Sequence, residues 1–167
     1  MKLEVGDRVV YGNHGVGRIV ARTKRDVLGQ KQEVVVVELD EELTVTLTVE
    51  RARAHLRPVV SGAELKRVRD ALREDVPLST DNWLSRRSEA LKKLTAGHPV
   101  AFAELVSEGA QRERARSAQG AKPQLSPGER ELFGRARSLL SGEIAIALDV
   151  EPAAAEEWID RYLERPA

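Results

Sequence analysis

The residues with the clearest chemical potential surround a tryptophan near the middle of the chain, in Asp81-Asn-Trp83-Leu-Ser-Arg86-Arg87. At about 100° per residue on a helix, Trp83 lies at the edge of an apolar stripe. Arg86 and Lys93 lie just beyond Trp83 on the same flank. In one interpretation the indole closes the core and an arginine stacks on its face. In the other, the cations hold phosphates and the indole wedges against a base step of DNA. The stripe expected to face the core consists of Leu84, Leu91 and Leu94.

Further cations are available for such a surface. Arg130 and Arg137 are seven residues apart and therefore share a helix face. Residues 86–137 hold 11 basic and 6 acidic residues, a net charge of +5, although the whole chain balances 27 against 27. A local basic block sets the field that a duplex meets, but it is also what a solvated helical surface looks like. Two further basic groups could join this surface: one shares a face of the first predicted helix, Lys66, Arg69 and Arg73, and the other precedes a predicted linker at 117–124, Arg112, Arg114 and Arg116.

Other kinds of site find little support. The segment Gly12-Asn-His-Gly15-Val-Gly17 is glycine-rich, but a phosphate-binding loop needs a helix after it, and β-branched residues follow here. A hairpin turn is the favoured interpretation. The three histidines, His14, His55 and His98, have no partner at metal-ligand spacing. The chain has no cysteine, which excludes disulfides and thiolate catalysis. We therefore expect no catalytic residues, no metal and no cofactor.

The elements that must position these residues fall into two halves. Up to about Pro58 the pattern is that of short strands, rich in β-branched residues and separated by turn-like segments. Five strands in so few residues predict a small barrel or a strongly bent sheet. The predicted turns are Gly12–Gly15, Leu28-Gly29 and Asp40–Glu42, and the predicted strands are Arg8–Tyr11, Val16–Arg22, Gln32–Leu39, Leu43–Val49 and Arg53–Arg57.

Beyond Pro58 the period becomes helical. A first helix is predicted after a capping box, Ser61-Gly-Ala-Glu64, and a second from near Thr80 to Gly97. A third helix runs from about Val100 towards Arg116, and the segment 117–124 is interpreted as a flexible linker. A second capping box, Ser126-Pro-Gly-Glu129, opens a long helix with Pro127 at its first position, and a last helix begins near Pro152.

The predicted strands also offer an interaction surface. Thr44, Thr46 and Thr48 alternate along one strand, whose polar edge is suited to pairing with a strand of another protein. An ordinary solvated face explains the same pattern and is favoured by the residues alone. The longest apolar runs, such as Val34–Val37, are far too short for a membrane span. We expect a cytoplasmic protein without membrane contact.

Five segments in order resemble the CarD/CdnL family of bacterial transcription regulators. The first is Val5-Gly-Asp-Arg-Val-Val-Tyr11 with His14-Gly-Val-Gly17, a start shared with transcription-repair coupling factors. The others are Gly29, Asn82-Trp83, Leu91-Lys-Lys-Leu-Thr-Ala-Gly97, and Leu125-Ser-Pro-Gly-Glu-Arg130 leading to Arg135-Ala-Arg-Ser-Leu-Leu140. The resemblance implies an α+β protein with a Tudor-like (SH3-like) barrel of about five strands, residues 1–58, and an all-α bundle of about five helices, residues 59–167.

The resemblance also implies a function without catalysis. The barrel is expected to bind the β subunit of RNA polymerase, and the helical domain promoter DNA at the upstream edge of the transcription bubble. A tryptophan matching Trp83 wedges into the minor groove and stabilises the open complex. The resemblance assigns polymerase binding to Arg25, in the loop before Gly29, and to a strand position that is Thr46 or a neighbour such as Thr48. With the basic residues around it, Trp83 gives an expected DNA-binding set of Trp83, Arg86, Arg87, Lys93, Arg130 and Arg137.

The chain departs from the family pattern after the tryptophan. Members often show Ser-Arg-Arg-Tyr there, whereas Leu84 intervenes here and Ser85 replaces one basic residue. A threonine, Thr46, stands where some members carry a second polymerase-contacting arginine. The Ser85 departure favours an alternative, a protein-interaction adaptor that binds RNA polymerase without functional DNA contact. In either case we expect a monomer.

Overall fold

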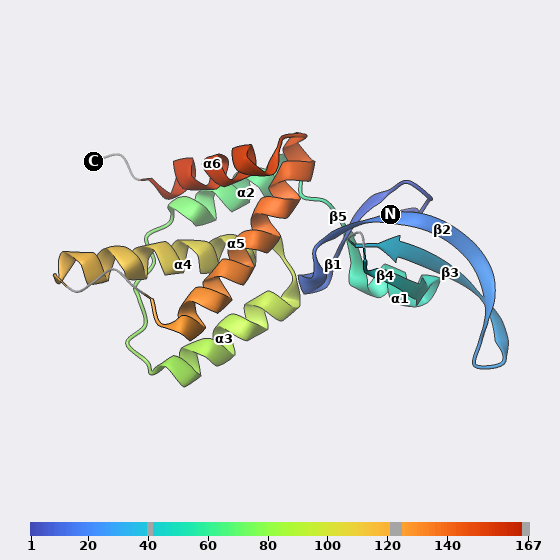
Figure 1. Ribbon diagram of the computed structural model, residues 1–167, viewed down its shortest axis with the longest axis horizontal. Coiled ribbons are helices and arrows are strands. Elements are labelled where there is room, and N and C mark those ends of the chain that lie inside the picture. The colour runs from blue at the N-terminus through green and yellow to red at the C-terminus, as the bar shows by residue number, and fades with distance from the viewer. Residues whose placement is uncertain (40–41, 121–124, 165–167) are drawn as a thin grey trace. The chain divides into compact units, whose positions relative to one another are not determined.

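The computed structural model describes residues 1–39, 42–120 and 125–164 and divides the chain into two compact units. Met1–Val59 carry all the strands and one short helix, and Val60–Ala167 carry the remaining helices. Figure 1 follows this order along the chain. A small antiparallel sheet followed by a helical bundle confirms the predicted fold class.

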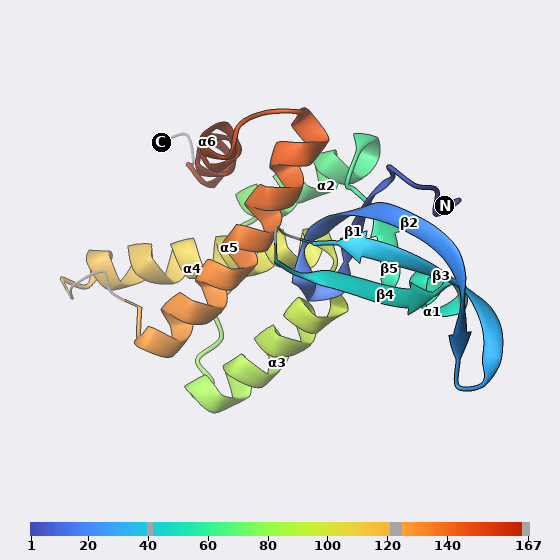
Figure 2. The same ribbon diagram turned by 45° about the vertical axis from the view of Figure 1, so that its right-hand side comes forward.

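The N-terminal unit is a five-stranded antiparallel sheet in the order β4-β3-β2-β1-β5. Its two long central strands curve strongly, as Figure 2 shows, which is the bent sheet expected from so many short strands. A turn of 3-10 helix, η1 (Gly12–His14), joins the first two strands, so the glycine-rich segment is a hairpin connection. The strands are β1 (Arg8–Tyr11), β2 (Val16–Val27), β3 (Gln30–Glu38), β4 (Thr44–Thr48) and β5 (Leu56–Pro58).

Alternation along the strands builds the core of this unit. Val35 and Val37 of β3 face Leu47 of β4 and Ile19 of β2 in one buried cluster, closed by Ala52. The register between β2 and β3 shifts between Ile19 and Ala21, a bulge that bends the strand. The hairpin beyond this bulge ends in a turn at Leu28-Gly29, where both residues have positive φ.

The predicted fifth strand forms, but it is displaced from the predicted range Arg53–Arg57. This segment belongs mostly to a helix, α1 (Val49–His55), and β5 begins only at Leu56. The helix forms because the Thr48 side chain accepts a hydrogen bond from the backbone N–H of Arg51, which caps the first turn. Ala52 then packs against the sheet and is completely buried.

Within its described residues, the C-terminal unit contains five helices around one core. Phe102 and Leu105 of the helix Pro99–Ala118 belong to this core. They pack with Leu140 and Ile144 of the helix Pro127–Leu148 and with Ile159 of the last helix, and all five residues are at most 1% exposed. None of the helices within the described ranges combines the length and apolarity that a membrane crossing requires. The helices are α2 (Gly62–Arg73), α3 (Trp83–Ala96), α4 (Pro99–Ala118), α5 (Pro127–Leu148) and α6 (Pro152–Leu163).

The predicted helix signals succeed in most places. Gly97 ends α3 in the left-handed conformation, and Pro99 opens α4. The capping box at Ser126 and Glu129 forms with both of its hydrogen bonds. The segment interpreted as a linker begins inside α4, which ends at Ala118, and its residues 121–124 lie outside the described residues.

The capping box predicted at Ser61 and Glu64 does not form. The Ser61 side chain makes no cap hydrogen bond at the start of α2. The Glu64 carboxylate instead lies 2.9 Å from Nε2 of His98. That histidine also caps α4, because its Nδ1 accepts a hydrogen bond from the backbone N–H of Val100 at 3.3 Å. Glu64 therefore joins α2 to the start of α4 and is not available to cap its own helix.

Candidate functional site

Trp83 is the first residue of α3, and its indole lies against the start of α5. Asn82 caps the helix, since its side chain accepts a hydrogen bond from the backbone N–H of Ser85 at 3.0 Å. The indole is half-buried and packs against the helical core. A Cβ placed on Gly128 would lie only 3.2 Å from the indole Nε1 and Cζ2 atoms. Glycine at this position therefore lets the backbone of α5 approach the ring.

The face that α3 turns to the core is not the predicted one. Leu84 is 77% exposed and Leu91 is 36% exposed, while Ala90 and Leu94 are buried. The inner face consists of Trp83, Arg86, Ala90 and Leu94, at helical spacings of three and four. Because Arg86 belongs to this face, it is only 14% exposed along its side chain. The expectation that leucines alone define the buried side is therefore wrong.

Arg86 stacks on the indole and pairs with a carboxylate. Its guanidinium carbon lies 5.3 Å from the centre of the Trp83 ring, within cation–π range. Its Nη2 donates to Oε1 of Glu129 at 3.1 Å, and its Nε donates to the carbonyl oxygen of Asp81 at 3.1 Å. These contacts agree with the interpretation in which the indole closes the core and an arginine stacks on its face. The charge of Arg86 is thus directed at the protein.

Glu129 is the centre of this cluster. Its carboxylate is 2% exposed and accepts hydrogen bonds from the backbone N–H of Ser126, from Arg86 and from Arg116 at the end of α4. Burial raises the pKa of Glu129, but the hydrogen bonds from Ser126 and then from Arg86 and Arg116 outweigh it and lower the pKa from 4.5 to about 2. The carboxylate is therefore ionised at neutral pH.

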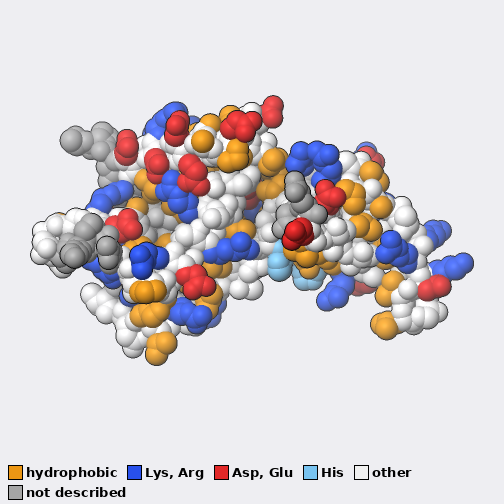
Figure 3. All heavy atoms as spheres, in the orientation of Figure 1, with side chains coloured by type: hydrophobic (Ala, Val, Ile, Leu, Met, Phe, Trp, Pro, Cys, Tyr) orange, Lys and Arg blue, Asp and Glu red, His pale blue; other side chains and the backbone are white. Residues whose placement is uncertain are grey.

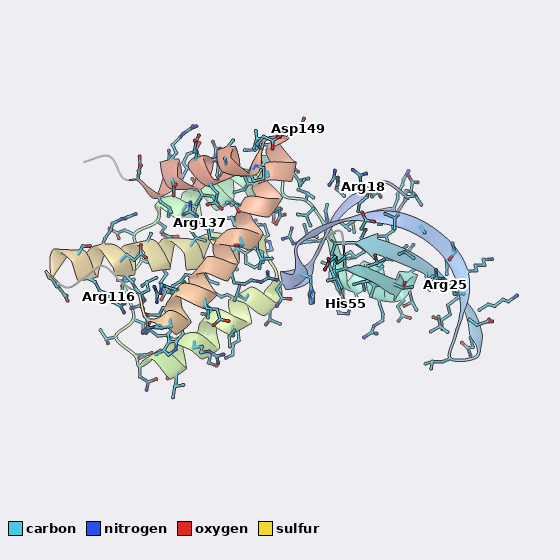
Figure 4. All side chains as sticks on the ribbon, in the orientation of Figure 1. Arg18, Arg25, His55, Arg116, Arg137 and Asp149 are labelled. Atoms are coloured by element: carbon cyan, nitrogen blue, oxygen red, sulfur yellow. The ribbon has the colours of Figure 1, made fainter. Side chains whose placement is uncertain are left out.

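Two other cations expected to bind DNA are paired within the protein. Arg137 belongs to α5 (Figure 4), and its side chain contacts two carboxylates of α6. It pairs with Glu156 and donates a hydrogen bond to Asp160 at 2.7 Å. Burial lowers the pKa of Arg137, but hydrogen bonds to Asp160 and Glu156 raise it overall, so it stays charged. Lys93 pairs with Glu104 of α4 at 2.9 Å and remains 44% exposed.

Arg87 and Arg130 differ from these paired cations. Both are exposed, and neither forms an ion pair with any residue that the structure describes. Arg87 follows Trp83 by one turn of α3, and Arg130 lies in the first turn of α5, two residues after Gly128. They are the members of the predicted DNA-binding set whose charge is available to an outside anion. Figure 3 shows Lys and Arg side chains interspersed with Asp and Glu over the visible face of this unit.

The residues expected to bind polymerase lie on the β2–β3 hairpin and on the strand β4. Arg25 is exposed on the β2–β3 hairpin, opposite Gln32, and Figure 4 shows it there. Thr46 is exposed on β4, which among the described strands pairs with β3 alone and is therefore an edge strand. Thr48 is half-buried at the end of β4, and its hydroxyl already accepts the hydrogen bond that caps α1. Arg25 and Thr46 are thus accessible, and Thr48 is occupied.

The described residues show no sign of a metal centre, because no three His, Asp or Glu side chains among them lie close enough to hold an ion. A hollow of about 930 Å³ lies along α4, α5 and α6. Its lining includes Arg114, Arg137 and Asp160. Arg114 donates to the carbonyl oxygen of Leu163 at 2.7 Å, and the other two pair with each other. These groups hold the helices together.

Sequence reasoning missed the roles of three residues around Trp83 and Arg86, namely Glu129, Arg116 and Gly128. Glu129 was identified only as a capping residue, and its pairing with Arg86 joins positions 43 residues apart. Arg116 was grouped with exposed cations before the predicted linker, yet it donates to the same carboxylate. Gly128 carried no separate signal, since its role is to admit the indole of a distant helix.

Two family models match consecutive parts of the chain. Residues 3–60 match the CarD-like/TRCF RID domain, and residues 67–160 match the CarD C-terminal domain. The first match spans the sheet with α1, and the second covers most of the helical unit, Trp83 and Glu129 included.

Proposed function

Because the chain belongs to the CarD family, whose members are RNA polymerase-interacting transcription regulators and not enzymes, we propose that it stabilises the open promoter complex. In this proposal residues 1–58 bind the β subunit of the polymerase. Residues 59–167 contact promoter DNA at the upstream edge of the transcription bubble. The protein acts as a monomer, with Trp83 as the wedge in the minor groove.

The observation that carries the proposal is the setting of Trp83. The indole is half-buried at the start of α3, backed by Gly128 and covered on one face by Arg86. A ring held on two sides loses little side-chain entropy when it contacts a base step. The exposed charges of Arg87 and Arg130 lie in the first two turns of α3 and α5 and suit phosphate contacts.

The accessible edge of the sheet supports polymerase binding by the N-terminal unit. A free edge strand presents unpaired backbone groups, to which an extended segment of a partner can add. β4 has such an edge, with Thr46 exposed on it, and Arg25 lies exposed on the adjacent hairpin. We assign the contact to Arg25 and Thr46, and give Thr48 an indirect role through the cap of α1.

The energy that this function requires is small. Slowing bubble collapse tenfold needs only ~1.4 kcal/mol of preference for the open complex. One stacked aromatic and two phosphate contacts are of that order. Binding of the N-terminal unit to the polymerase raises the local concentration of the helical unit at the promoter. Weak intrinsic DNA affinity is then sufficient, which agrees with a net charge of zero.

The test is the lifetime of open complexes formed by RNA polymerase with and without the purified protein. Challenge with a competitor such as heparin, followed over time, reports the rate of collapse. We expect a several-fold longer lifetime with the protein on promoters whose open complexes are unstable. Unchanged lifetimes on a panel of such promoters would contradict the proposal.

A second candidate is an adaptor that binds the polymerase without functional DNA contact. The pairing of Arg86, Arg137 and Lys93 with carboxylates favours it, because these cations already have partners within the protein. The two functions differ in one measurement. Crosslinking of residues 86–137 to promoter DNA within the polymerase complex, weakening with salt, is expected for the first function and not for the adaptor.

A further inference from the structure

One buried carboxylate joins the starts of α3 and α5 to the end of α4. Oε1 of Glu129 accepts from Nη2 of Arg86 at 3.1 Å, and Oε2 accepts from the backbone N–H of Ser126 at 2.8 Å. Nη2 of Arg116 donates to both carboxylate oxygens, at 3.2 and 3.1 Å. Glu129 itself is 1% exposed. Since an unpaired buried charge is costly, this arrangement fixes where both guanidinium groups lie.

The same arrangement determines the surroundings of the indole. The guanidinium of Arg86 covers one face of the Trp83 ring at 5.3 Å. The backbone of α5 approaches the ring edge at Gly128, where a Cβ would lie 3.2 Å from Nε1 and Cζ2. The ring therefore has the guanidinium group of Arg86 over one face and a close backbone contact at its edge. Both come from consecutive residues of α5, Gly128 directly and Glu129 through Arg86.

Removing the carboxylate charge disturbs this arrangement in a predictable way. Arg86 and Arg116 would keep their charges without an anion between them. Nη1 of Arg86 is already buried without a hydrogen-bond partner among the described residues. With the Glu129 charge removed, the lowest-cost response of Arg86 is to turn towards water. The indole then loses the group that covers its face.

We propose that Gly128 and Glu129 are positioning residues for Trp83. Glu129 acts through Arg86, and Gly128 acts by admitting the ring edge. Neither residue needs to touch DNA. In the open complex they present the indole in one orientation, so this part of the inference rests on the proposed function. The arrangement of the free protein does not.

The first test compares two buried glutamates of the same helix. The Trp158→Phe background leaves Trp83 as the only tryptophan, because the chain has two. Glu129→Gln removes the charge that holds Arg86. The matched control is Glu143→Gln, since Glu143 is equally buried on α5 but accepts a hydrogen bond from the backbone N–H of Val60. Fluorescence of the free full-length protein reports the environment of the indole.

The second test compares two glycines of α5. Gly128→Ala adds a methyl group against the ring, whereas Gly134→Ala adds one where nothing lies within 4 Å. Both changes raise helix propensity. Gly128→Ala also leaves the Glu129 carboxylate in place. It therefore decides the matter if circular dichroism shows that Glu129→Gln does not fold.

For Glu129→Gln and Gly128→Ala we expect a red-shifted emission, at least twofold stronger quenching by acrylamide, and an open-complex lifetime at least threefold shorter. The two controls should match their background in all three readouts. Unchanged emission and quenching in both test variants would overturn the inference. The inference would also be overturned if both test variants kept a normal open-complex lifetime on promoters where Trp83→Ala shortens it. A third outcome is that Trp83→Ala leaves the open-complex lifetime unchanged while the emission of Glu129→Gln and Gly128→Ala shifts. The proposed function then fails, and the positioning of the indole stands.

Discussion

Arg86 and Glu129 meet at 3.1 Å and tie the first turn of α3 to the first turn of α5. This pair places a cation over an aromatic ring that the family resemblance assigns to DNA contact. The charge of Arg86 therefore serves to orient the ring. Of the predicted basic set, only Arg87 and Arg130 are left without an ion pair inside the described part of the chain.

Trp83→Ala should shorten open-complex lifetimes about tenfold, which corresponds to ~1.4 kcal/mol. The indole is half-buried against the core, so its loss should also lower the free energy of unfolding by about 2 kcal/mol. Competitor-challenge assays measure the first effect and urea denaturation measures the second. Binding to polymerase should be unchanged, because the substitution lies in the helical unit. A lifetime equal to that of the wild type on several promoters would remove the wedge from the mechanism.

The carboxylate of Glu129 should make stability pH-dependent in acid. Its pKa is lowered in the folded protein to about 2, from 4.5. Stabilisation is therefore fully present above pH 4.5 and is lost as the pH falls through 2. At ~1.4 kcal/mol per pKa unit, the loss is roughly 3 kcal/mol. Urea denaturation at intervals from pH 5 to 2 should show the advantage of wild type over Glu129→Gln shrinking by this amount. A constant difference would argue against an ionised carboxylate.

Arg87→Ala should weaken DNA contact, whereas Arg137→Ala should lower the stability of the helical unit. Arg87 is exposed and forms no ion pair with the residues that the structure describes, so its loss should weaken crosslinking to promoter DNA and reduce the salt dependence of that contact. Arg137 joins α5 to Glu156 and Asp160 of α6, so its loss should lower the thermal midpoint and leave crosslinking intact. Crosslinking yields over a salt series, beside thermal melts of both variants, separate the two. Equal crosslinking in both variants would place the phosphate contact elsewhere.

Arg25→Glu should weaken binding to an isolated fragment of the polymerase β subunit at least tenfold. Arg25 is exposed on the hairpin and makes no ion pair among the described residues, so reversing its charge costs the fold little. The control is Arg8→Glu, an equal charge reversal on β1. Isothermal titration calorimetry of both variants gives the comparison. Equal affinities for wild type and Arg25→Glu would move the interface to another surface.

Local signals predicted most of the elements, because they depend on neighbours in the chain. The strands follow from runs of β-branched residues, and α5 begins where Ser126 and Pro127 indicate. The helix α1 was missed because its start depends on one hydrogen bond, which the Thr48 hydroxyl accepts from the backbone N–H of Arg51. The local pattern instead predicted a short strand over Arg53–Arg57.

The orientation of α3 shows the limit of periodicity. Leu84, Leu91 and Leu94 form a helical stripe, and an arginine on the inner face contradicts what hydrophobicity predicts. Arg86 can be buried there only because Glu129 supplies a carboxylate from α5. A partner 43 residues away leaves no mark on the local pattern. The tryptophan was identified from its residue type, but its surroundings required the fold.

Glycine at position 128 is favoured by the close approach of its aromatic neighbour and not by its backbone conformation, since Gly128 is not among the glycines with positive φ. Its constraint therefore belongs to the pair it forms with Trp83. Where a smaller side chain replaces the tryptophan, alanine at 128 becomes acceptable and, as a better helix former, favourable. Across related chains the two positions should covary, with glycine retained wherever the large ring is kept.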